Sequence, residues 1–230
     1  MTQNRLFSDQ DLKEMGTQTV GLVERAIDNG DYEEAKRLAR RMYREFSAMH
    51  DVYVNWVTAI LTFVYNRYGD EALQDAQRAG VTRWITPIPQ IYAGKDAKHR
   101  ARLLVSALRG HLQPMEVRED DEKFIIMMHP CGSGARLVHQ GAYEGPNSYA
   151  KIKNRQAMTF GRRNLPVYCA HCFMTTVVAI DISGIPVFVT VPGRTIGKDP
   201  CQFHIYKDPH AVPQEVYAMV GKEKPINSKK

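Results

Sequence analysis

Apolar side chains recur at intervals of three and four residues through most of the first 112 residues, and this is the period of an amphipathic helix. The pattern is clearest in residues 31–49, where a basic stripe occupies the face opposite the apolar one. We therefore predict a mainly helical first half, with helices over residues 8–29, 31–49, 51–68, 71–79 and 96–111.

Residue types that favour helix ends separate these segments. Ser8 is suited to cap a helix N-terminus, and Gly30 is typical of a helix C-terminus. Gly69 and Asp70 interrupt the apolar pattern again. Residues 86–89, with the sequence TPIP, predict an extended linker because a residue that precedes proline is disfavoured in a helix.

The predicted helix 51–68 is apolar nearly all round, which is typical of a helix inside a bundle or at a subunit interface. A homodimer is one expectation from this feature. A membrane span is not expected, because the most apolar stretch, residues 52–65, is shorter than the roughly 20 residues that cross a bilayer.

The pattern changes after Pro114. Residues 123–128, 185–191 and 202–207 favour strands, whereas residues 172–182 fit either a helix or a strand. We expect an α+β protein whose helical N-terminal half packs on a C-terminal half with a small antiparallel sheet and helices. The expected regions are 1–114, an α+β metal-binding or ligand-binding region over 115–210, and a C-terminal segment over 211–230 with a disordered tail; these could also form one domain.

Composition and charge limit the classes of partner that we expect for this chain. Apolar residues make up 43% of the chain, which is ordinary for a globular protein, and the net charge is 31 − 25 = +6. The basic residues are spread along the chain, so we interpret them as a solvated surface and do not expect a nucleic-acid partner. The N-terminus is polar and lacks the apolar core of a signal peptide, so a cytoplasmic location with reduced thiols is expected.

All four cysteines lie in the second half: Cys131, Cys169, Cys172 and Cys201. Cys169 and Cys172 form a C-x-x-C pair, which can grip one ion from a single turn. The other two stand where a predicted strand meets a turn, and such positions can converge in a folded chain. We predict one metal site, with zinc as the expected ion and iron as the alternative.

Other interpretations of the cysteines stay open. They could be small buried apolar side chains, or the C-x-x-C pair could be a redox dithiol. His129 and His171 are further candidate ligands. The signature of zinc deaminases is absent, because no glutamate stands two residues after His129 and no proline directly precedes Cys169.

The segment Cys131-Gly-Ser-Gly-Ala-Arg carries candidate chemistry. If a helix begins there, its free amides could hold an anionic group, so Ser133, Gly134 and Arg136 are predicted substrate contacts. Cys131 is a candidate nucleophile if it is not a ligand. His129 and Glu144 are candidate groups for proton transfer.

An apolar strand ending near Cys131, the element Tyr168-Cys169-x-x-Cys172 and the strand start Cys201-Gln202-Phe203 together resemble the L-2-amino-thiazoline-4-carboxylic acid hydrolase-like family. The similarity covers residues 120–207. Cys172 stands where that family carries an acidic residue. More distantly, the region resembles the 4-vinyl reductase domain, a small-molecule-binding module that also ends in a cysteine-containing strand.

Two functions follow as expectations. The first resemblance implies a metal-dependent hydrolase that cleaves a carbon–nitrogen or carbon–sulfur bond of a small polar or heterocyclic compound. The second implies a non-catalytic small-molecule-binding or sensor domain with a structural zinc–cysteine site.

Overall fold

The computed structural model describes residues 6–225 and divides the chain into two compact units, which meet in sequence between Tyr53 and Val54. The expected region boundary near residue 114 does not coincide with this division. The predicted disordered tail falls partly on residues 226–230, which lie outside the described residues.

The first unit consists of α1 (Asp9–Met15), α2 (Thr19–Asp28) and the beginning of α3 (Tyr32–Ile85). Ser8 caps α1 as expected. The prediction of one helix over residues 8–29 is wrong, because the chain leaves the helix after Met15 and re-enters it at Thr19. Leu22 and Ala26 of α2 pack against Ala35 and Leu38 of α3.

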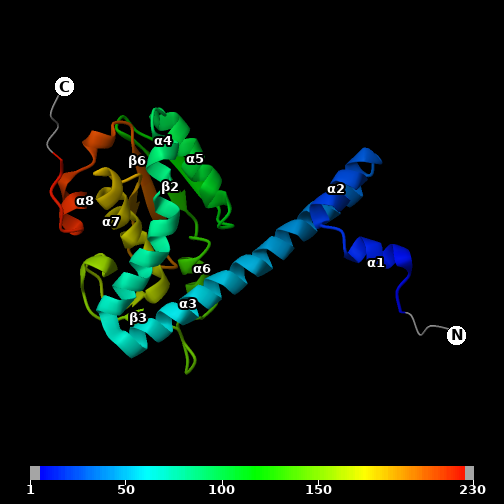
Figure 1. Cartoon of the computed structure of the whole chain (residues 1–230), viewed down its shortest axis with the longest axis horizontal. Coiled ribbons are helices and arrows are strands. Elements are labelled where there is room, and N and C mark those ends of the chain that lie inside the picture. The colour runs from blue at the N-terminus through cyan, green and yellow to red at the C-terminus, as the bar shows by residue number, and fades with distance from the viewer. Residues whose placement is uncertain (1–5, 226–230) are drawn as a thin grey trace. The chain divides into compact units, whose positions relative to one another are not determined.

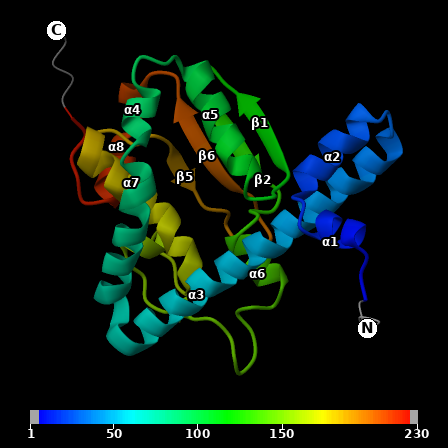
Figure 2. The ribbon, with the colours of Figure 1, turned by 45° about the vertical axis from the view of Figure 1, so that its right-hand side comes forward.

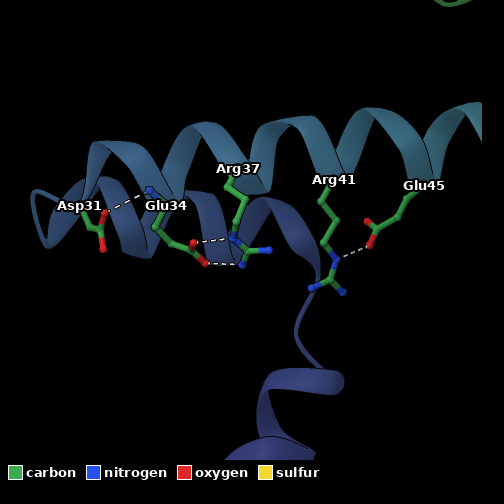
Figure 3. Close-up of polar contacts among 5 residues, drawn as sticks. All are labelled: Asp31, Glu34, Arg37, Arg41 and Glu45. Atoms are coloured by element: carbon green, nitrogen blue, oxygen red, sulfur yellow. Dashed lines mark hydrogen bonds and ion pairs between the residues drawn. The ribbon is translucent and has the colours of Figure 1, made fainter.

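The basic stripe at the start of α3 is paired with carboxylates on the same helix (Figure 3). Arg37 donates to Glu34, and the Arg41 Nε lies 2.7 Å from a Glu45 carboxylate oxygen. Asp31 accepts a hydrogen bond from the backbone amide of Glu34 and so caps the helix. These contacts neutralise part of the stripe.

Helix α3 joins three of the predicted helices into one element, so the expected helix start at Asp51 is wrong. The predicted interruption at Gly69 is confirmed: its φ of 82° lies in the left-handed region, and α3 changes direction there. The predicted linker over residues 86–89 is wrong in part. Pro87 has a right-handed helical conformation and leads directly into α4 (Ile88–Tyr92), which α5 (Ala97–Arg109) follows.

A four-stranded antiparallel sheet in the order β1-β2-β6-β5 organises the second unit (Figure 2). Strand β2 (Lys123–Met128) is found where it was predicted, and β6 (Cys201–Tyr206) starts one residue early. Strand β1 (Met115–Glu119) was not predicted, because MEVRE is mostly polar and lies at the sheet edge. Strand β5 covers only Val189–Val191, the end of the expected strand.

The ambiguous residues 172–182 form a helix, α7 (His171–Ser183), whose residues from Phe173 to Ile180 are all buried. A helix that is buried on every side shows no amphipathic period, and this explains the ambiguity. Residues of α7, of α5, of the second part of α3 and of the sheet share one apolar core. Figure 1 shows α7 and α5 beside the sheet strands. The predicted α+β class is confirmed.

Shorter elements complete the second unit: α6 (Gly134–His139), β3 (Lys151–Ile152), β4 (Leu165–Pro166), α8 (Gln214–Met219) and the 3-10 turns η1 (Ala157–Thr159), η2 (Val167–Ala170) and η3 (Pro209–Ala211). Strands β3 and β4 pair with each other in a separate two-stranded sheet. Across residues 6–225, none of the helices has the length and apolar character needed to cross a bilayer.

Candidate functional site

A cavity of about 340 Å³ lies within the second unit, and all four cysteines line it. Its walls are mainly apolar and come from α4, α5, the sheet and the start of α7; Ile88, Leu104 and Phe203 are examples. Its size and lining are those of a small-molecule pocket.

The strand pairing explains how two distant cysteines reach one place. Strands β2 and β6 are antiparallel, with Met128 opposite Cys201, so the end of β2 lies beside the beginning of β6. Cys131 follows Met128 by three residues and therefore lies near Cys201 although 70 positions separate them in sequence. Both residues line the cavity.

Cys169 and Cys172 reach the cavity from η2 and from the first turn of α7. The hydroxyls of Thr175 and Thr190 both donate to the backbone carbonyl of Cys172, at 2.7 and 3.4 Å. Thr190 belongs to β5, so this contact ties the start of α7 to the sheet. The predicted convergence of the four cysteines on one region is therefore what the fold produces.

Gly134 has a steric role beside Cys169. A Cβ atom at position 134 would lie 2.6 Å from the Cys169 sulfur, closer than such atoms approach in proteins. The residue was predicted as a substrate contact, and it does line the cavity. The close approach shows that its missing side chain makes room for a cysteine.

The His171 imidazole also lines the cavity, and its ring nitrogens lie near Tyr168 and Cys172. Its Nδ1 lies 2.6 Å from the Tyr168 carbonyl oxygen, and its Nε2 lies 3.5 Å from the Cys172 sulfur. Since a carbonyl only accepts hydrogen bonds, Nδ1 carries the proton. Burial lowers the pKa of His171, while the Tyr168 hydrogen bond and the charge of Cys131 act in the opposite direction.

Ser133 joins two other polar side chains at the cavity. Its hydroxyl lies 3.0 Å from the Nδ1 of His111 and hydrogen-bonds with the Tyr168 side chain. Burial raises the pKa of Tyr168, whereas the Ser133 hydrogen bond lowers it. The predicted substrate contact Ser133 therefore belongs to a hydroxyl–imidazole network on the wall.

The surroundings of the Cys169, Cys172 and Cys201 sulfur atoms disfavour their thiolate forms. Burial raises the pKa of Cys172 to about 12 and that of Cys201 to about 11, and it raises the pKa of Cys169 well above its usual value. Neighbouring cysteine charges raise the pKa of Cys169 and Cys201 further, while the Gly193 amide, 3.3 Å from the Cys201 sulfur, lowers that of Cys201. Thiolates here need a compensating positive charge.

Three of the predicted site residues do not line the cavity: His129, Arg136 and Glu144. His129 is 43% exposed and lies 3.7 Å from Glu116. Glu144 is exposed in the loop after α6. Sequence reasoning grouped these residues because they are near Cys131 in the chain, but the turn after β2 and the course of α6 separate them from the cavity.

His111, Tyr168 and Gln113 line the cavity but were not among the predicted site residues. Gln113 accepts a hydrogen bond from the Gly132 amide at 2.8 Å and so fixes the turn that carries Cys131. The signal in the sequence was weak, since only the adjacency of Tyr168 to the C-x-x-C pair marked any of the three.

Within residues 6–225, no set of three or more histidine, cysteine, aspartate or glutamate side chains is placed so that it could hold a metal ion. No family model, no curated protein and no solved structure matches the chain. The resemblance to the thiazoline-carboxylate hydrolase-like family therefore stays a prediction.

Proposed function

We propose that the chain binds a small organic molecule in this cavity, beside a zinc ion held by its cysteines. The observation that supports the proposal is that one cavity has mainly apolar walls and is lined by all four cysteines. Apolar walls favour a ligand through burial, and a few convergent polar groups orient it.

The donor set fits zinc. Thiolate and imidazole are the ligands that zinc takes most often in proteins, and four sulfur atoms suffice for a tetrahedral shell. A divalent cation would also supply the positive charge that the buried sulfur atoms need if they ionise. Binding requires the cysteine side chains to rotate toward a common centre, since the described residues hold no ready-made group of three ligands.

The ligand class follows from the walls. No aspartate, glutamate, lysine or arginine among the described residues lines the cavity, so a highly charged compound would lose its hydration without compensation. We propose an apolar ring compound with a sulfur or nitrogen donor that faces the metal. The proposed ligand therefore belongs to the less polar part of the class expected from the sequence, small polar or heterocyclic compounds.

Zinc binding is tested by replacing one ligand. Cys201→Ser should reduce bound zinc from one equivalent per chain and weaken its affinity at least about tenfold, because serine is a poor zinc ligand. Elemental analysis after gel filtration measures this. Unchanged stoichiometry and affinity would exclude Cys201 from the site.

Ligand binding is tested at the rim of the cavity. Ala107 of α5 lines it and is exposed, so Ala107→Trp should obstruct entry without burying a new group. With 2-mercaptobenzothiazole as the probe, calorimetry should show binding to the wild type and at least about tenfold weaker binding to the variant. Ser106→Trp, on the same helix but outside the lining, is the control and should bind as the wild type does.

A hydrolase is the second candidate, and the position of His171 favours it. A neutral imidazole at the cavity wall could take a proton from a metal-bound water, and the metal would polarise the bond to be cleaved. His171 replaces His129 and Glu144 in this role, because neither of those lines the cavity. The reaction would be hydrolysis of a carbon–nitrogen or carbon–sulfur bond in the bound compound. If the His171→Asn variant loses its zinc, any loss of turnover follows from the missing metal and does not identify His171 as the base.

The remaining expectations concern partners and location. We propose a homodimer formed through an exposed apolar stripe of α3, and we propose no nucleic-acid partner, because Arg37 and Arg41 are paired with Glu34 and Glu45. We place the protein in the cytoplasm, a reducing compartment that suits four unpaired cysteines.

A further inference from the structure

Both ring nitrogens of His171 have a defined neighbour. Its Nδ1–H donates to the Tyr168 carbonyl oxygen at 2.6 Å, so the lone pair of the ring is on Nε2. Metal-binding histidines commonly have this arrangement, in which one ring nitrogen donates to a backbone carbonyl and the other faces the ion. The hydrogen bond fixes both the tautomer and the plane of the ring.

The distance from Nε2 to the neighbouring sulfur supports the same role. Zinc binds sulfur at about 2.3 Å and imidazole nitrogen at about 2.0–2.1 Å in a tetrahedron, so two such ligands stand roughly 3.6 Å apart. The His171 Nε2 and the Cys172 sulfur are 3.5 Å apart. Two adjacent residues at the start of α7 therefore already have the spacing of a nitrogen and a sulfur ligand of one ion.

We propose that His171 is a ligand of the metal centre through Nε2, with Cys172 as its neighbouring ligand. This inference rests on the proposed zinc site and gives it a mixed thiolate–imidazole character. It excludes His171 as the base of the hydrolase alternative, because Nδ1 already carries a proton and the Nε2 lone pair would be bound to the metal. The four cysteines and His171 then make five candidate ligands, which is one more than a tetrahedral zinc takes. Because one donor is in surplus, one sulfur ligand can be replaced at the zinc by a donor atom of the organic ligand.

X-ray absorption at the zinc edge of the zinc-loaded full chain tests the inference without any substitution. We expect a shell with nitrogen at about 2.0–2.1 Å as well as sulfur at about 2.3 Å. A shell of sulfur alone would overturn the inference and leave the zinc site in place. Failure of the chain to bind zinc at all would overturn the proposed function itself.

Two variants assign the nitrogen. His171→Asn should remove the nitrogen component and weaken zinc binding by at least about 100-fold, more than the usual effect of losing an outer contact to a ligand. His111→Asn is the matched control, because His111 also lines the cavity but hydrogen-bonds with Ser133. Retention of the nitrogen shell in His171→Asn, or its loss in His111→Asn, would contradict the assignment.

Discussion

At the scale of single residues, the site depends on places where a side chain is missing. A Cβ at Gly132 would collide with the His111 carbonyl oxygen, and one at Gly193 would collide with the Asp199 carbonyl oxygen. Gly132 directly follows Cys131 in the sequence. The backbone amide of Gly193 lies 3.3 Å from the Cys201 sulfur. At Gly132, Gly193 and Gly134 a side chain would collide with a backbone carbonyl oxygen or a sulfur atom, so only glycine allows these close approaches.

Gly134→Ala should impair the site by contact alone. The added methyl group would lie 2.6 Å from the Cys169 sulfur and must displace it. We expect zinc affinity to fall at least about tenfold and stability to fall by about 1–3 kcal/mol, the usual effect of overpacking. Chelator competition and urea unfolding measure the two effects.

Gly80→Ala is the control for this substitution, because Gly80 lies in α3 and a Cβ atom added there would meet nothing within 4 Å. It should leave zinc affinity unchanged and raise stability by up to about 1 kcal/mol through its helix propensity. Equal zinc affinity in both variants would show that Cys169 is not held where the close contact places it.

At the scale of elements, antiparallel pairing and the buried helix determine the site. Cys131 and Cys201 meet because the end of β2 lies beside the start of β6, while α7 brings Cys172 to the same cavity. Asp181, near the other end of α7, lies 2.6 Å from both Arg78 of α3 and Lys222 after α8. This ion pair network fixes α7 against its neighbours.

Asp181→Asn should destabilise the second unit in a pH-dependent way. Burial raises the pKa of Asp181, but hydrogen bonds from Lys222 and Arg78 outweigh it, so its pKa is lower than usual. The stabilisation is therefore complete above the ordinary carboxyl pKa and is lost as the pH falls through the lowered value. We expect a loss of about 1 kcal/mol at pH 7 and a difference that vanishes in acid, measured by urea unfolding.

Glu33→Gln provides the comparison, because the Glu33–Lys36 pair is largely exposed and screened. Its effect at pH 7 should be smaller than that of Asp181→Asn. A destabilisation by Asp181→Asn that stays constant from pH 7 into acid would show that charge is not its cause.

The sequence predicted elements well where one face is buried and poorly where the surroundings are uniform. Strand β2 and the break at Gly69 had local signals, an apolar run and a glycine. Helix α7 did not, because burial on all sides removes its period. The sequence also predicted that the cysteines share a region, but placing His129 and Glu144 outside the cavity required the three-dimensional course of the chain.

At the scale of the whole molecule, the part of α3 that belongs to the first unit presents an exposed apolar stripe in sequence steps of four and three: Met42, Phe46, Met49 and Tyr53. This is the period of about 3.5 residues that pairs one helix with another. A second copy of the chain supplies a helix with the same spacing, which supports the proposed homodimer.

Phe46→Lys combined with Tyr53→Lys should abolish the dimer, because two charges would enter its apolar seam. Light scattering should give a mass of about twice 26.2 kDa for the wild type and 26.2 kDa for the variant. Ala48→Lys adds a charge to the opposite face of the same helix and should remain dimeric. A wild type of 26.2 kDa at micromolar concentration would contradict the dimer.

The account depends on thiols from distant parts of the chain that close around one cation, and native mass spectrometry tests this most directly. Apo protein, with and without added zinc, is treated with a thiol-alkylating reagent. With zinc, the chain should take up one ion, and most of its four cysteines should then be protected from alkylation. The account would be contradicted if the chain took up no zinc and its cysteines were alkylated at the same rate with and without added zinc.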